Sequence, residues 1–206
     1  MDTHRRQLVT AGIAGAASSL AFANGPAMPQ RMSPFAAALI SNAAASDRPD
    51  LYGQFIGAWE AEGQAFLPDG SKRRHYWQIY FARVLEGRAV QDVWITPARR
   101  GRHVGQSQPW GPFTNQYGTT LRIYDSKIDA WRVTWLDPAA GYRADLIGRA
   151  QGDGIFQEGA GSDGARLRWI FSDIRDRSFR WRAEVSRDEG ASWHKALELL
   201  AESDPS

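Results

Sequence analysis

The chain has 206 residues, 43% hydrophobic and 23% charged, which suits one globular domain with a modest N-terminal extension. It contains no cysteine, which excludes disulfides, thiolate catalysis and cysteine-ligated zinc or iron–sulfur centres. Its 25 basic and 23 acidic residues give a net charge of +2, which is too small to indicate a nucleic-acid partner. The chain is rich in tryptophan, and its nine indoles would suit either a packed core or an aromatic cavity.

Residues 1–23 have the pattern of an export signal. A basic group at residues 4–6 precedes a weakly apolar run, which ends in a small-x-small cleavage site at residues 21–23. The paired arginines resemble a twin-arginine signal, and the run is too short and too interrupted for a stable membrane span. We therefore expect a periplasmic protein, or a cytoplasmic one if translation starts at Met28 or Met32.

Residues 24–50 are predicted to form a linker and a short helix. Three prolines interrupt the segment 24–34, which is typical of a linker. Ser33 suits the N-cap and Pro34 the first position of a helix that we expect to end near Ala45.

Residues 51–202 consist of short alternating runs separated by tight-turn residues, and residues 203–206 form a tail. Successive side chains of a strand point to opposite faces, so Trp131, Val133 and Trp135 share one face. Nine or ten strands are expected, at 59–67, 73–84, 88–96, 117–124, 131–137, 142–150, 154–159, 165–172, 179–186 and 192–200. The short connections favour an all-β fold, an antiparallel up-and-down β-barrel preceded by a short helix, with an open sandwich as the alternative.

Three segments carry a resemblance to a known family. They are FIGAWEAEG at 55–63, VLEGRAVQDVWI at 84–95, and YGTTLRIYD with DAWRVTWLDP at 117–138. Together they resemble an uncharacterised family of bacterial lipocalin-like, calycin-type barrels over residues 50–202. This resemblance implies a barrel fold and a small-molecule cavity, and it implies no reaction.

A more distant similarity is to nitrobindin-type haem barrels, whose first strand carries a G-x-W-x-G-x-G run. Gly57, Trp59 and Gly63 match this run, whereas Ala61 replaces one of its glycines. Those proteins bind iron through a histidine on a late strand, and the late histidine here, His194, is expected to be exposed. Haem is therefore kept only as an alternative, and otherwise we expect no cofactor and no metal.

Polar residues on an inward face are the candidate site, because burying one unpaired costs several kcal/mol, roughly 2–7. On strand 88–96, the face of Val90 and Trp94 also carries Arg88 and Asp92, which are spaced to form an ion pair. The pair would be purely structural, or it would anchor the polar group of a ligand, with Asp92 as the candidate catalytic base.

The remaining candidates form the body and the mouth of a cavity. Tryptophans would line its body, namely Trp59, Trp94, Trp135 and Trp169. Polar residues near strand ends would surround its mouth, namely Asp137, Tyr142 and Glu158. Asp137 also suits the start of a turn, and the Arg-rich loop 97–114 is interpreted as a lid, an anion-binding loop or a solvated loop.

These patterns favour a barrel that binds a small, partly hydrophobic molecule. The first alternative is a cofactor-free isomerase, cyclase or hydratase, in which Asp92 moves a proton and Arg88 stabilises an oxyanion. The second is a structural or interaction barrel with no open cavity. Neither a nucleophile elbow nor metal-ligand spacing is present, and the oligomeric state is left open, a dimer being one option.

Overall fold

The computed structural model describes residues 32–204 except 44, 46 and 98–115. The chain divides into two units, Met1–Met32 and Ser33–Ser206, and the second unit contains every described helix and strand. The predicted export signal at residues 1–23 and most of the loop 97–114 lie outside the described residues.

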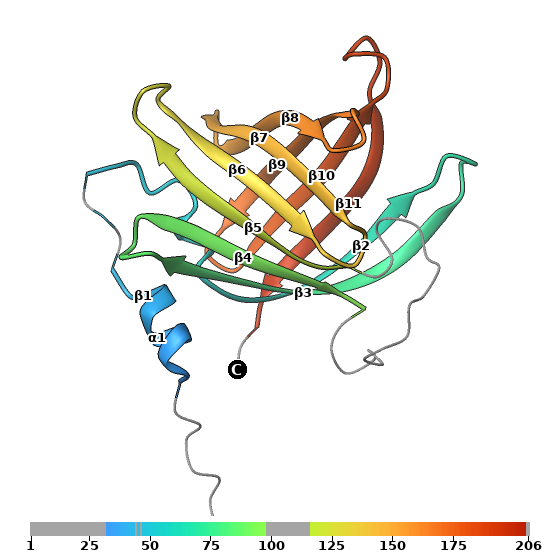
Figure 1. Ribbon diagram of the computed structural model, residues 1–206. Coiled ribbons are helices and arrows are strands. Elements are labelled where there is room, and N and C mark those ends of the chain that lie inside the picture. The colour runs from blue at the N-terminus through green and yellow to red at the C-terminus, as the bar shows by residue number, and fades with distance from the viewer. Residues whose placement is uncertain (1–31, 44, 46, 98–115, 205–206) are drawn as a thin grey trace, which may run out of the picture. The chain divides into compact units, whose positions relative to one another are not determined.

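Ten antiparallel strands close into a barrel (Figure 1). Each strand pairs with the next along the chain, and the last strand pairs with the first. The strands are β2 (Gly57–Phe66), β3 (Lys72–Val84), β4 (Ala89–Thr96), β5 (Gln116–Asp125), β6 (Ala130–Asp137), β7 (Tyr142–Gln151), β8 (Gly154–Gly161), β9 (Arg166–Arg175), β10 (Ser178–Ser186) and β11 (His194–Ser203). The predicted all-β barrel with a short N-terminal helix is confirmed, and the open sandwich is excluded.

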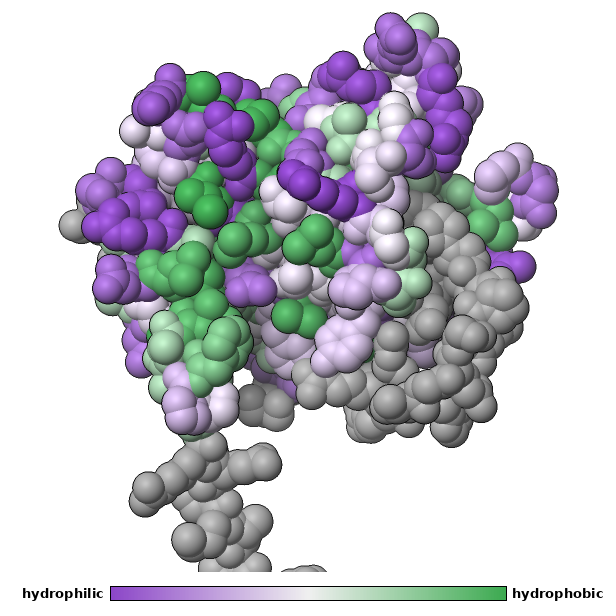
Figure 2. Space-filling view, in the orientation of Figure 1, coloured by the Kyte–Doolittle hydropathy of each residue, from purple (hydrophilic) through white to green (hydrophobic). Residues whose placement is uncertain are grey.

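The helix α1 (Pro34–Leu39) begins as predicted and ends earlier than predicted. The Ser33 Oγ accepts a hydrogen bond from the Ala36 N–H at 3.2 Å, which caps the first turn. The chain then forms the two-residue strand β1 (Ile40–Ser41), which pairs with the end of β3. Pairing with β3 requires extended backbone, so the helix cannot continue to residue 45. Figure 2 shows a hydrophobic surface over α1, where Phe35 is 75% exposed.

Alternation along the strands separates a dry interior from a charged outer wall. On β9 and β10, Leu167, Phe171, Phe179, Trp181 and Ala183 are all buried. Arginines of the same two strands point outward and pair with carboxylates on the surface. The barrel therefore follows the pattern of an antiparallel sheet with one buried face.

A segment that precedes β2 fills one end of the barrel. The 3-10 helix η1 (Gly53–Phe55) places the Phe55 ring against Phe171 and Phe179, with ring centroids 4.8 and 4.9 Å away. The Trp59 indole N–H donates to the Phe55 carbonyl oxygen at 2.7 Å, which fixes the segment to β2. Tyr52 adds a second ring, 5.2 Å from that of Trp131. We call residues 51–55 the plug, because their aromatic rings close this end of the interior.

None of the helices within the described ranges is long and apolar enough to cross a membrane.

Candidate functional site

A cavity of about 260 Å³ lies in the other half of the barrel interior. Its walls come from the ends of strands that are far apart in the sequence, including Trp94 on β4, Gln116 on β5, Leu167 on β9 and Leu197 on β11. The plug seals one end of the barrel and the cavity occupies the opposite part. The interior is therefore filled on one side and hollow on the other.

Four tryptophans form the apolar wall of the cavity: Trp94, Trp135, Trp169 and Trp181. Trp181 contacts two of the others, with ring centroids 4.9 Å from Trp94 and 5.9 Å from Trp169. Trp135 rests against Gly118 on the neighbouring strand, where any side chain would overlap its ring. Trp181 packs against two of the other indoles and Trp135 packs against Gly118, so the wall has a defined shape before any ligand binds.

An ion pair between neighbouring strands lies at the inner part of the cavity. The Arg122 Nη1 is 2.6 Å from the Asp92 Oδ2, and these side chains are only 2% and 0% exposed. The Asp92 Oδ1 also accepts a hydrogen bond from the Thr120 backbone N–H at 2.9 Å. Arg122 and Thr120 line the cavity, whereas Asp92 lies behind them. The pair is thus a buried, charge-balanced anchor with its cationic partner toward the cavity.

Arg122 also connects the cavity to the plug. Its guanidinium carbon lies 4.9 Å from the centre of the Tyr52 ring and 5.5 Å from that of Phe81, a cation–π arrangement. Burial raises the pKa of the Tyr52 hydroxyl well above its ordinary value, so this group is neutral at physiological pH. The guanidinium is therefore fixed between two rings on one side and Asp92 on the other.

The rim of the cavity carries a second ion pair. The Arg187 Nη2 is 3.3 Å from the Asp163 Oδ2, and both residues are exposed. Burial, followed by the negative charge of Asp163, raises the pKa of the Tyr142 hydroxyl to about 12. Asp137 is buried, and its Oδ1 accepts hydrogen bonds from the Ala139 and Ala140 backbone N–H groups. Asp137 thus starts a turn and also lines the cavity.

The predicted site residues divide into two groups. Five of them line the cavity: Trp94, Trp135, Asp137, Tyr142 and Trp169. Asp92 lies directly behind the lining residue Arg122. Trp59, Arg88 and Glu158 lie elsewhere. Trp59 packs in the plugged half, with its ring centroid 4.9 Å from that of Phe179.

The predicted pairing of Arg88 with Asp92 is wrong. Arg88 precedes β4 in the turn after β3, where Leu85 and Glu86 have positive φ, so the alternation of β4 does not extend to it. Its side chain is 61% exposed and its Nη1 is 3.6 Å from the Asp47 Oδ2 outside the barrel. The prediction that Asp92 shares an inward face with Val90 and Trp94 holds, since all three are buried.

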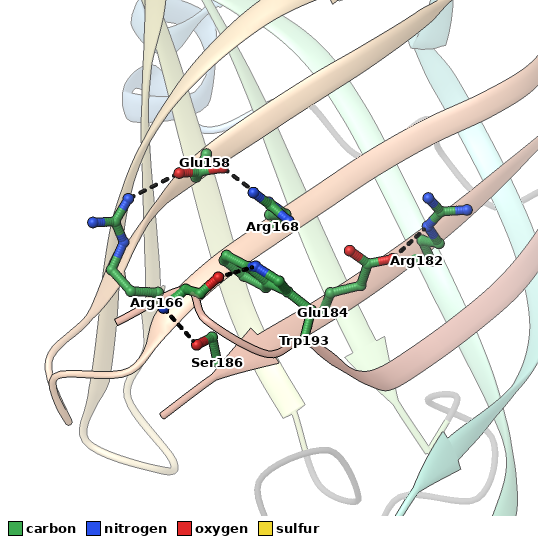
Figure 3. A network of polar contacts seen from close by, with 8 residues as sticks. Glu158, Arg166, Arg168, Arg182, Glu184, Ser186 and Trp193 are labelled. Carbon is green, nitrogen blue, oxygen red and sulfur yellow. Dashed lines mark hydrogen bonds and ion pairs between the residues drawn. The ribbon is translucent and has the colours of Figure 1, made fainter. Parts of the chain in front are cut away.

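Glu158 belongs to the outer wall and does not reach the mouth. Its carboxylate accepts from the Arg166 Nη2 and the Arg168 Nε, both at 2.8 Å (Figure 3). These two cations, Arg168 foremost, lower the pKa of the Glu158 carboxyl. The Arg168 guanidinium in turn lies 3.7 Å from the centre of the Trp193 ring. This cluster explains Glu158 as part of a surface network between β8, β9 and the end of the β10–β11 loop.

Sequence reasoning missed Arg122, which is the cation nearest the inner cavity. On β5 the inward residues are Gly118, Thr120 and Arg122, while Leu121 and Ile123 point outward. Hydrophobicity therefore predicts the opposite face for this strand. The inward face of β5 is identified only by its register with β4. In that register the inward residue Asp92 pairs with Thr120, so Thr120 and its alternate neighbours also point inward.

Among the described residues, no group of three or more histidine, aspartate or glutamate side chains is placed to hold a metal ion. His194 begins β11 and is exposed, as the sequence predicted.

Comparison with known proteins gives a distant structural similarity and no match by sequence. Neither a family model nor a curated protein matches the chain. Among solved structures, the crystal structure of Rv2717c from M. tuberculosis is similar, with 12% sequence identity and a TM-score of 0.47. The alignment covers 77% of this chain and 99% of that one. The strand pairing by itself defines a closed ten-stranded antiparallel barrel, and the lipocalin-like and nitrobindin-type resemblances stay predictions.

Proposed function

We propose that the protein binds a small, partly hydrophobic molecule in the tryptophan-lined cavity. The observation that carries this proposal is a space of about 260 Å³ bounded by four indole rings and backed by a buried arginine. Binding pockets commonly combine apolar walls with a few fixed polar groups. The volume lies just below the ~300–1,000 Å³ range of pockets for drug-sized ligands, which favours a ligand of one or two rings.

The polar groups of the cavity support the same interpretation. Arg122 and Thr120 lie at its inner part, and Tyr142 lies near its rim. A ligand with one hydrogen-bonding group would meet donors at a fixed position while its apolar part contacts the indoles. The sequence pattern of residues 1–23 adds export to the periplasm to the proposal.

The two alternative functions find less support. Asp92 is fully buried behind Arg122, and its two oxygens contact Arg122 and the Thr120 N–H, which leaves a general base poorly placed to meet a substrate. A barrel without an open cavity is favoured only by the plugged half. Ligand binding therefore accounts best for the hollow half.

Native mass spectrometry of the protein purified under non-denaturing conditions tests the proposal. We expect a mass above that of the denatured polypeptide, corresponding to a bound small molecule. The same molecule should be depleted in the variant Trp169→Ala, which opens the cavity wall, and retained in Trp193→Ala. Trp193 is a matched control because it is a half-buried indole on the outer surface. A bare polypeptide mass, together with no binding of 2-naphthamide in calorimetry, would contradict the proposal.

A further inference from the structure

We propose that the cavity selects uncharged ligands over anions, because Asp92 already neutralises Arg122. This inference rests on the proposed function and deepens it by naming the chemical class of the ligand. An arginine in an apolar pocket would ordinarily indicate an anionic ligand. Here, however, Arg122 already has an anionic partner, because Asp92 on strand β4 of the barrel wall forms an ion pair with it.

The ion pair has little freedom to rearrange around a ligand. Asp92 contacts the Arg122 Nη1 at 2.6 Å and is held from the other side by the Thr120 N–H at 2.9 Å. The guanidinium is confined between the Tyr52 and Phe81 rings. Neither side chain can turn away into solvent, since both are buried. The two charges therefore remain together when the cavity fills.

A carboxylate bound at Arg122 would place a second anion beside a single buried cation. Like charges in a site that excludes water disfavour each other strongly, and desolvating the incoming anion adds to this cost. A carbonyl or amide oxygen meets no such penalty. It can accept a hydrogen bond from a guanidinium N–H, of which arginine has five.

The other described charges around the cavity do not attract anions either. At the rim, Arg187 is paired with Asp163 at 3.3 Å. Asp137 adds a further carboxylate to the lining. Both guanidinium groups that the described residues bring to the cavity, those of Arg122 and Arg187, are therefore already paired with carboxylates. The tyrosine at the rim, Tyr142, adds no charge at physiological pH, since its pKa is raised still further above neutrality, to about 12.

Isothermal titration calorimetry with two matched probes tests the selection. 2-Naphthamide and 2-naphthoate share ring and size and differ in charge at pH 7. We expect the wild-type protein to bind the amide at least tenfold more tightly. Equal affinity, or tighter binding of the naphthoate, would overturn the inference and leave the proposed function standing. If neither probe binds, the inference is contradicted, and the native mass decides separately whether the proposed function stands.

The variant Asp92→Asn tests the cause. It removes the neutralising charge, so the ratio of naphthoate to naphthamide affinity should rise at least tenfold. Asp173→Asn is the matched control, because Asp173 is an exposed carboxylate paired with Arg180 on the outer wall. A folded Asp92→Asn protein with an unchanged ratio would contradict neutralisation by Asp92. If that variant does not fold, the wild-type comparison alone still decides whether uncharged ligands are selected.

Discussion

The hydroxyl group of Tyr52 occupies the space that a side chain at Gly148 would need. A β-carbon built on Gly148 would overlap the phenolic oxygen. Tyr52 belongs to the plug and Gly148 to the wall strand β7, so the two fit together through one missing side chain. The next side chains, those of Val133 and Gln157, both lie 3.4 Å from the position of this β-carbon and would tolerate it. The plug is therefore positioned by shape as well as by aromatic packing.

Replacing Gly148 by alanine should destabilise the protein. The added methyl group forces Tyr52 and the plug away from the wall, and such overpacking typically costs about 1–3 kcal/mol. Urea unfolding measures the change in the free energy of unfolding. Ala150→Val is the control, because Ala150 is exposed on the same strand and its replacement should cost less than about 0.5 kcal/mol. In a double-mutant cycle, Tyr52→Phe should recover part of the loss, and strictly additive effects would contradict a direct clash.

Breaking the buried ion pair should cost more than breaking a surface one. Arg122→Met leaves Asp92 buried without its partner, for which about 3–5 kcal/mol is typical. Arg180→Gln breaks an exposed pair with Asp173 and should cost less than about 1 kcal/mol. The double variant Asp92→Asn with Arg122→Met should be more stable than Arg122→Met alone. Similar losses in free energy of unfolding for the buried and the exposed variant would contradict the assigned burial.

Gly118 should control the shape of the ligand cavity. An alanine there would overlap the Trp135 ring and push it into the space available to a ligand. We expect Gly118→Ala to weaken the binding of 2-naphthamide about tenfold, as a misfit of one methyl group does in other pockets. The control is Ile123→Ala, on the exposed face of the same strand, which should leave the affinity unchanged. Unchanged affinity in both variants would place the probe away from Trp135.

Stability should fall at high pH through Tyr142. Its pKa is raised from 10.0 to about 12 in the folded protein, first by burial and then by Asp163. Below pH 10 the hydroxyl is protonated in both states. Between pH 10 and 12 the unfolded chain releases this proton while the folded protein retains it, so stability decreases as pH rises. Comparing the unfolding of wild type and Tyr142→Phe across this range isolates the effect.

The variant Asp163→Asn provides a second check on the same residue. Removing the negative charge should lower the pKa of Tyr142 without restoring its ordinary value, because burial remains the larger cause. The ionisation of Tyr142 can be followed as the difference in absorbance at alkaline pH between each protein and its Tyr142→Phe counterpart. An unchanged pKa would show that Asp163 does not act on the hydroxyl group.

The barrel could be predicted from sequence because alternation and turn residues are local signals. Each predicted strand lies within three residues of an observed one at both ends. The predicted helix is too long because Ile40 and Ser41 pair with β3 and therefore cannot be helical. This pairing joins residues that are far apart in the sequence. Local propensity has no information about such a partner.

The candidate site was predictable only in part, for a related physical reason. Trp94 and Trp135 lie on strands with clear alternation, so their inward direction could be inferred. The partner of Asp92 could not be inferred, because Arg122 lies on a different strand, β5. Strand β5 also carries more hydrophobic residues on its outer face than on its inner face. Pairing across strands depends on register, which no single strand specifies.

The pairing of β2 with β11 has a consequence for how the protein is made. Leu199 pairs with Gly63, so the first and last strands of the barrel are neighbours although nearly the whole domain separates them in the chain. During synthesis β2 emerges early and must wait for β11, and until then both margins of the growing sheet present unpaired backbone groups. A chain that stops after β10 would expose two open edges able to recruit strands from other molecules. Loss of only the final ten-residue strand should therefore produce aggregation in place of a smaller barrel.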